Sequence, residues 1–188
     1  MRLVPWWAVL SSACAPVLLI GGWQLAAARQ RGGFDPVRQT ISALAARGAT
    51  EPWIMTTALA GVGVCHMITA AGLASAAVPG RVLLAVGGVA TVSLAALPLP
   101  VTGDSPAHVA AAAIAFSALS LWPALAARRG AQPGPAVWCS AATGLLGLLS
   151  WFGLDYVVEG PRIGLSERVL AGAQALWPLA AVFLARRR

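Results

Sequence analysis

Two carboxyl groups in the C-terminal third of the chain have a spacing suited to acid–base chemistry. Asp155 and Glu167 lie in consecutive apolar segments joined by a short connection, so we expect them at similar depth on neighbouring antiparallel helices. Two carboxylates close together in a low-dielectric site cannot both ionise cheaply, so one of them would stay protonated and act as a general acid. The alternative is an ion pair at the membrane surface, in which Glu167 or Glu159 binds Arg162 or Arg168.

Tryptophans accompany both carboxyl groups. Trp151 precedes Asp155 by four residues and shares its helical face, while Gln174 shares the face of Glu167 with Trp177 close by. Tryptophan rings stabilise cations, so an apolar cavity with such walls and a protonated carboxyl group suits proton-initiated cyclisation or isomerisation of an isoprenoid chain. Aromatic belts at the two membrane surfaces are the alternative explanation of the tryptophans. The chain has no aspartate-rich motif for a diphosphate, and we predict no cofactor.

The two histidines are further candidates for catalysis. His66 lies fifteen residues from both Glu51 and Arg81, which places it roughly 22 Å from either end of a helix and near the bilayer midplane. An ionisable group at that depth is a candidate functional group, and a neutral imidazole bonded to a neighbouring helix is the alternative. His108 follows Asp104 by four residues, so the carboxylate can reach the imidazole. Two histidines are too few for a three-histidine zinc site, and no metal site is predicted.

Six uncharged stretches must position these groups. They cover residues 3–28, 52–80, 82–103, 105–127, 130–154 and 169–185. Five of the stretches contain 22 residues or more, whereas a helix needs about 20 apolar residues to cross a bilayer. The composition, 59% hydrophobic and 10% charged, agrees with burial in lipid. We therefore predict an all-α protein, a six-helix transmembrane bundle that forms one integral membrane domain over residues 1–188. The predicted spans are about 3–28, 53–77, 82–100, 106–127, 135–157 and 166–185.

The connections and glycines indicate how the spans pack. All connections except the first are short, so consecutive spans should be antiparallel neighbours. Pairs of glycines in the second, third and fifth spans predict faces where helices approach closely. These pairs are Gly61 and Gly63, Gly87 and Gly88, and Gly144 and Gly147.

The first connection has the signals of a short helix of its own. Asp35 is a typical N-cap, Pro36 fits the first helical position, and Gly48 can end the helix. An apolar stripe with helical spacing lies between these signals, formed by Val37, Ile41 and Leu44. We predict a short amphipathic helix from Pro36 to about Arg47, on the membrane surface or in the mouth of the bundle.

One motif in this connection carries a family resemblance. The segment from Asp35 to Ser42 reads Asp-Pro-Val-Arg-Gln-Thr-Ile-Ser, and Trp53-Ile54-Met55 follows at the start of the second span. Together they resemble the bacterial six-span membrane proteins grouped as domain of unknown function 998. The likeness extends over nearly the whole chain and includes Glu167 and Arg168. The resemblance implies the fold and the topology, and it implies no reaction.

The charges suggest an orientation. All thirteen basic residues are arginines at the ends of spans, where they anchor the chain at lipid headgroups, so the net charge of +7 does not indicate a nucleic-acid partner. Seven arginines share the side of the termini and six lie on the other side, together with all six carboxylates. This weak positive-inside bias predicts cytoplasmic termini in a multi-pass plasma-membrane protein. The three cysteines all fall within predicted spans, which argues against a disulfide framework.

Two functional hypotheses follow. The first is a membrane-embedded enzyme that acts on a lipid or isoprenoid, with Asp155 or Glu167 as the acid and His66 and His108 as further candidates. The second is a non-catalytic lipid-binding protein or a small proton-coupled transporter, which also needs a protonatable group at the midplane. Both predict a hydrophobic small molecule or lipid as partner, and the oligomeric state stays open. Candidate substrate-binding residues are Trp151, Trp177, Gln174, Trp53 and Arg38.

Overall fold

Each of the six uncharged stretches forms a long helix in the computed structural model, which describes residues 4–103 and 105–186. All six helices are long and apolar enough to cross a membrane. The elements are α1 (Trp6–Ala28), η1 (Ser42–Ala45), α2 (Trp53–Gly72), α3 (Val78–Ala96), α4 (Pro106–Leu121), η2 (Trp122–Leu125), α5 (Pro135–Val157) and α6 (Ile163–Arg186). The prediction of an all-α bundle with six spans is therefore confirmed.

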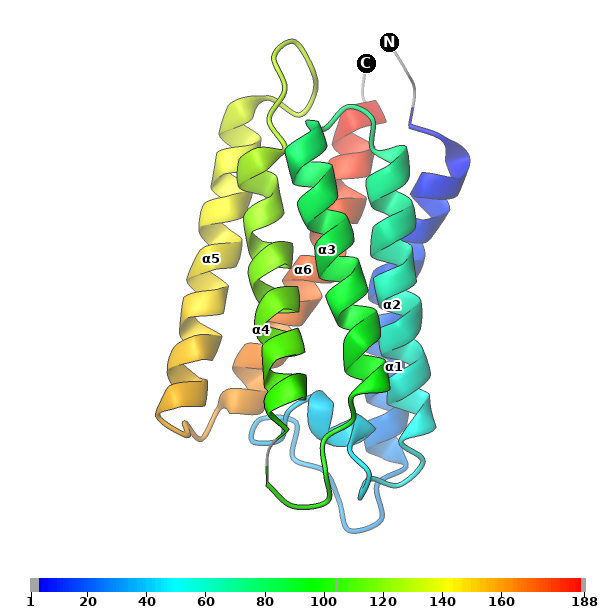
Figure 1. Cartoon of the computed structure of the whole chain (residues 1–188), viewed down its shortest axis with the longest axis vertical. Coiled ribbons are helices and arrows are strands. Elements are labelled where there is room, and N and C mark those ends of the chain that lie inside the picture. The colour runs from blue at the N-terminus through cyan, green and yellow to red at the C-terminus, as the bar shows by residue number, and fades with distance from the viewer. Residues whose placement is uncertain (1–3, 104, 187–188) are drawn as a thin grey trace.

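The helices form a closed ring. Each helix packs against the next one along the chain, and α6 packs against α1 (Figure 1). The connections after α1, α3 and α5 lie at one end of the bundle, here called the loop end. The opposite end, here called the terminal end, holds the start of α1, the end of α6 and the connections after α2 and α4. The even number of spans thus brings the start of α1 and the end of α6 to one side, as expected.

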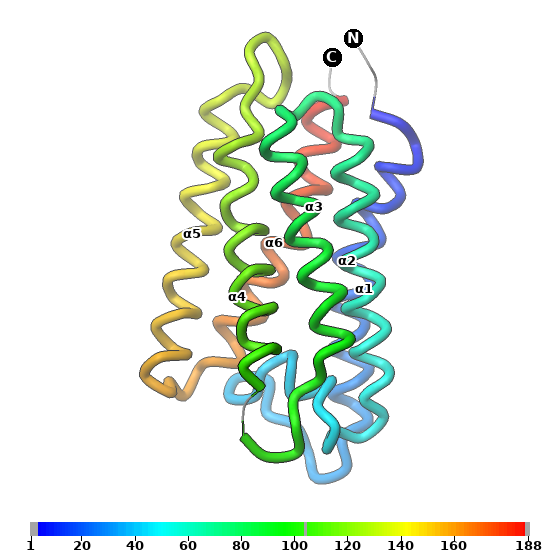
Figure 2. Tube along the Cα trace, in the orientation of Figure 1, coloured from blue at the N-terminus to red at the C-terminus, as the bar shows by residue number. Residues whose placement is uncertain are grey.

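Close helix packing is confirmed at the predicted glycine pairs of α2 and α3 and is absent at the pair of α5. A Cβ atom on Gly63 would lie only 2.4 Å from the carbonyl oxygen of Gly88, so α2 and α3 touch through their backbones. No atom lies within 4 Å of a Cβ built on Gly144 or Gly147, and the prediction of close packing there is wrong. In the most apolar stretch of α5 only 17% of the residues are buried, against 33–50% in the other helices. Helix α5 accordingly runs along the margin of the bundle (Figure 2).

The second span ends earlier than predicted, at Gly72, and an arginine caps its last turn. Arg81 lies inside the first turns of α3 rather than before that helix. Its Nε atom donates to the carbonyl of Ala70 and its Nη2 atom to that of Ala71, both at 2.7 Å. These two carbonyls belong to the last turn of α2, where no amide of the same helix is available.

The amphipathic helix predicted from Pro36 to about Arg47 is wrong in its extent. Residues 36–38 form a turn, and helical structure is limited to η1. The reason is competition for the backbone carbonyls. Those of Pro36 and Gln39 accept hydrogen bonds from Arg168, and that of Val37 accepts one from the amide of Leu165. A regular helix needs these carbonyls for its own amides.

Candidate functional site

Glu167 lies at the loop end, in the second turn of α6, with only 3% of its surface exposed. Its Oε2 atom accepts a hydrogen bond from the backbone amide of Ile41, the residue just before η1. The carboxyl group therefore receives a backbone donor that the short turn cannot satisfy by itself. A carboxyl group has lone pairs for several hydrogen bonds, so this contact leaves capacity for a ligand.

Arg168 fixes the first connection to the same turn of α6. Its Nη1 atom shares its two hydrogens among three carbonyl oxygens, those of Pro36 at 2.9 Å, Gln39 at 2.6 Å and Gly164 at 2.9 Å. Its guanidinium carbon lies 5.2 Å from the centre of the Phe34 ring, within the range of cation–π attraction. The ion-pair alternative predicted for Glu167 does not occur, because the ion pairs among the described residues are Arg29–Glu51 and Arg38–Asp35.

Hydrogen bonds within the motif of residues 35–42 form the turn that contacts α6. The Oδ1 atom of Asp35 accepts from the amides of Val37 at 2.9 Å and Arg38 at 3.3 Å, the bonds typical of an N-cap, but the segment that it caps is a turn and not the predicted helix. In return, Gln39 accepts from the amide of Asp35 through its Oε1 atom at 2.8 Å. Asp35 also pairs with the exposed side chain of Arg38, at 3.7 Å. The motif thus forms a self-capped turn that presents its carbonyls to α6.

A groove of about 460 Å³ lies between α4 and α5 and extends to the loop end. Its walls are mainly apolar and include a ladder of aromatic rings from both helices. The ring centres of Phe116 and Phe152 are 5.1 Å apart, and those of Phe152 and Tyr156 are 6.3 Å apart. The volume falls in the range of typical small-molecule sites, about 300–1,000 Å³. The space exists because α5 packs loosely against α4, where small residues such as Ala112 and Gly153 line the groove.

Polar groups gather at the loop end of this groove. They are Glu167, His108, Tyr156, Thr40 and Ser42. The Nδ1 atom of His108 lies 2.7 Å from the carbonyl oxygen of Leu97. A carbonyl only accepts, so Nδ1 carries the proton, and in the neutral form of the ring Nε2 is then an acceptor. The predicted partner of His108, Asp104, lies outside the described residues, and Leu97 orients the imidazole from α3's end.

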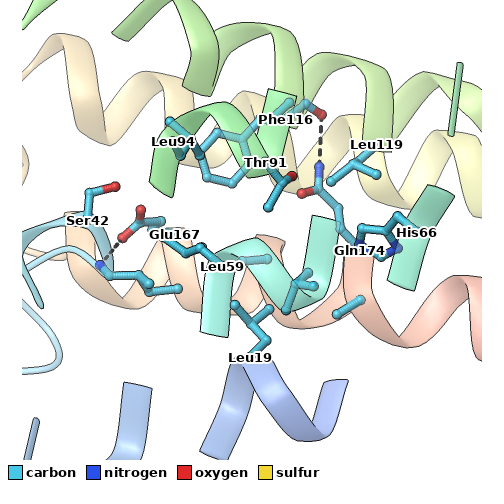
Figure 3. A pocket seen from close by; sticks show the side chains of 15 residues that line it. Leu19, Ser42, Leu59, His66, Thr91, Leu94, Phe116, Leu119, Glu167 and Gln174 are labelled. Carbon is cyan, nitrogen blue, oxygen red and sulfur yellow. Dashed lines mark hydrogen bonds between the residues drawn. The ribbon is translucent and has the colours of Figure 1, made fainter. Parts of the chain in front are cut away.

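A second, smaller cavity of about 50 Å³ lies inside the ring of helices. Glu167, Ala171 and Gln174 line it from one face of α6, as their spacing predicts. Gln174 joins α6 to α4, because its Nε2 atom donates to the carbonyl of Phe116 at 2.8 Å and to Ser120 at 2.9 Å. Figure 3 shows Glu167 towards one end of this cavity and Gln174 and His66 towards the other.

The predicted pair of Asp155 and Glu167 is not formed. Asp155 is 8% exposed, lines neither the groove nor the inner cavity, and its Oδ2 atom has no hydrogen-bond partner in the described part of the chain. A Cβ on Gly160 would meet its Oδ1 atom at 2.6 Å, so the carboxyl group lies against the loop after α5. The rotation of α5 explains this, because it turns Phe152 and Tyr156 towards α4 instead.

The tryptophans that were predicted to line the site line neither the groove nor the inner cavity. Trp53 is 61% exposed, and Trp151 is partly exposed on α5. Trp177 lies near the terminal end, where its ring centre is 5.9 Å from that of Trp138. Sequence reasoning missed the aromatic ladder that takes their place. Its signal was the spacing of Phe152 and Tyr156, which are four residues apart on either side of a glycine.

Among the described residues, no group of three or more histidine, cysteine, aspartate or glutamate side chains is placed to hold a metal ion. The six membrane-length helices define a multi-pass membrane protein. The family described as "Protein of unknown function (DUF998)" matches residues 12–184, and the chain belongs to this family. No curated protein and no solved structure matches the chain. The resemblance inferred from the Asp35–Ser42 motif is thus confirmed.

Proposed function

We propose that the protein binds a hydrophobic molecule that carries a hydrogen-bond-donating head group, such as an isoprenoid alcohol or amine. The observation that carries this proposal is the groove between α4 and α5, apolar along its length and polar at one end. Its aromatic ladder suits a long unsaturated chain that enters sideways from the bilayer. A pocket lined mainly by apolar side chains, with a few convergent polar groups, is the usual form of a ligand site.

The charges at the polar end favour a donor head group over an anionic one. Glu167 and the Nε2 atom of His108 are acceptors, and no arginine is among the described residues that line the groove. A hydroxyl or ammonium group satisfies these acceptors. When the carboxyl group of Glu167 is ionised, a carboxylate or phosphate head group would face a like charge at short range, and like charges repel.

Ligands that differ only in their head group test this proposal. We expect an isoprenoid alcohol and the matching amine to raise the melting temperature of the purified protein, because a ligand that binds the folded state stabilises it. The matching carboxylate should have little effect. Glu167→Gln, which keeps the acceptor for Ile41, should remove the preference for the amine over the carboxylate. Tighter binding of the carboxylate by the wild type would contradict the proposal.

A second candidate function is proton-initiated isomerisation of the bound chain. It is favoured by the two groups that share the polar end, because Glu167 can act as an acid and His108 as a base. Glu167 transfers its proton to one carbon of an alkene, and the adjacent carbon becomes a carbocation stabilised by the aromatic ladder. His108 Nε2 then removes a proton from a neighbouring carbon, and a shifted or cyclised alkene of the same composition results. Proton return to Glu167 closes the cycle.

Deuterium from the solvent reports this reaction. In deuterated buffer, a product formed by the wild type should carry deuterium on carbon. Glu167→Gln lacks a transferable proton, so the rate of incorporation should fall by roughly 100-fold or more. If the wild type incorporates no deuterium but still discriminates among head groups, the protein is a binder without this reaction. Equal incorporation by the wild type and Glu167→Gln would exclude Glu167 as the acid.

A further inference from the structure

His66 is buried in the middle of the bundle without a protein partner. Only 1% of its surface is exposed, and its Nδ1 atom has no hydrogen-bond partner among residues 4–103 and 105–186. A buried polar atom without a partner costs roughly 1–3 kcal/mol. The native structure must therefore provide a partner, and the side chain lines the inner cavity.

The inner cavity has the size and the polar groups that water requires. A site needs about 10–15 Å³ for the centre of one water molecule, together with polar partners. The cavity offers about 50 Å³. Its polar lining consists of His66, Thr91, Gln174, Ser42 and Glu167. Thr91 uses its proton on the carbonyl of Gly87, at 2.8 Å, so its lone pairs are left for a water molecule.

These groups are distributed along the cavity rather than clustered at one point. Glu167 and Gln174 are separated by seven residues of α6, which is roughly 10 Å along the helix. Ala171 lies between them, one turn from each, and also lines the cavity. Glu167 and His66 are the titratable residues among those that line it, one towards each end (Figure 3).

We propose that the inner cavity binds a file of water molecules that hydrogen-bonds His66 and reaches Glu167. The water gives the midplane imidazole a route for proton exchange with the loop end. The water file needs no ligand in the groove, although the groove and the inner cavity share Ser42, Phe116 and Glu167 as lining residues. The water file provides the access for protons that a proton-coupled transporter needs, because the apolar helices of the bundle otherwise exclude water.

Solid-state NMR on the full chain in lipid bilayers tests the water file. The chain contains two histidines, so ¹⁵N-histidine labelling yields two imidazole groups, and His108→Asn removes one of them for assignment. Magnetisation that starts on mobile water should reach the ring nitrogens of His66 at mixing times that also polarise His108, which lines the open groove. A His66 signal that receives no magnetisation from water while His108 is fully polarised would overturn the proposal.

Variants that fill the inner cavity provide a second test, and a matched variant in the groove provides its control. Ala171→Val places two methyl groups between Glu167 and Gln174 and should reduce transfer to His66 severalfold. Ala115→Val, on the opposite wall, serves the same purpose if the first variant is unstable. Ala113→Val adds the same methyl groups to the groove and should leave the transfer unchanged. Equal transfer to His66 in all three folded variants would also overturn the proposal.

Discussion

The side chain of Glu167 contacts a backbone amide, the groove and the inner cavity, and so connects these three features. Its carboxyl group binds the amide of Ile41, lines the groove between α4 and α5, and lines the inner cavity. A ligand in the groove and water in the cavity thus approach the same carboxyl group from two sides. Arg168 beside it performs a different task, since its hydrogen bonds go to the backbone of the first connection.

Because Arg168 holds the first connection against α6, replacing it by lysine should destabilise the protein even though the positive charge is kept. Arg168→Lys shortens the side chain, so the ammonium group no longer reaches the position from which Nη1 contacts the carbonyls of Pro36, Gln39 and Gly164. We expect the free energy of unfolding to fall by about 1.5–3 kcal/mol, the range for one hydrogen bond of a charged group. Denaturant titration in mixed micelles measures this loss.

Arg162→Lys is the control, because Arg162 is exposed in the loop just before α6 and its side chain makes none of these contacts. It should change the free energy of unfolding by less than about 0.5 kcal/mol, as usual for surface substitutions. Equal losses in the two variants would contradict the docking role of Arg168.

The ionisable residues of the candidate site could be predicted from the sequence, but which of them lie close together could not. The spacing on α6 predicted that Glu167 and Gln174 share a face, and both line the inner cavity. Asp155 was misplaced because its orientation depends on the rotation of α5, which an almost uniformly apolar helix does not reveal. The contact of Glu167 with Ile41 spans 126 residues, and no local pattern reports such a contact.

At the scale of elements, the first turn of α6 and the first connection act as one unit. The connection approaches so closely that a Cβ on Gly164 would lie 2.3 Å from the carbonyl oxygen of Gln39. Gly164→Ala should therefore push the connection away and cost about 1–3 kcal/mol, as overpacking does. Thermal unfolding measures the cost, and faster tryptic cleavage at Arg38 and Arg47 reports the displaced connection.

Gly147→Ala is the matched change on α5. No atom lies within 4 Å of a Cβ at Gly147, and alanine favours a helix over glycine by about 0.5–1 kcal/mol. This variant should be as stable as the wild type or more stable, with unchanged cleavage of the first connection. If Gly164→Ala behaves in the same way, the close approach of the connection to α6 is wrong.

The helices were predictable because lipid imposes length and polarity on each span separately. The first connection was not, although Asp35 makes the predicted capping hydrogen bonds, to a turn instead of a helix. Capping is a local interaction, whereas the absence of a longer helix results from the backbone bonds that Arg168 and Leu165 make from a distant part of the chain. The glycines of α5 failed as packing signals for a similar reason, since nothing in their spacing reveals which face meets lipid.

At the scale of the whole molecule, the arginine count predicts that the loop end faces away from the cytoplasm. Cysteine labelling tests this orientation after Cys14, Cys65 and Cys139 are replaced. A membrane-impermeant maleimide added to intact cells should label Arg31→Cys at the loop end. It should label Arg129→Cys at the terminal end only after the cells are permeabilised. The reverse pattern would show the opposite orientation and leave the bundle itself unaffected.

The most direct measurement of the proposed function maps where a hydrophobic ligand lies. An isoprenoid alcohol with a photoreactive diazirine on its chain is irradiated with the protein in bilayers, and the labelled peptides are identified by mass spectrometry. We predict labels on groove residues such as Ala112 and Phe152, and their loss when Ala113→Trp fills the groove. Labels spread over lipid-facing residues such as Val17, which is 71% exposed, and unaffected by Ala113→Trp would contradict a binding site between α4 and α5.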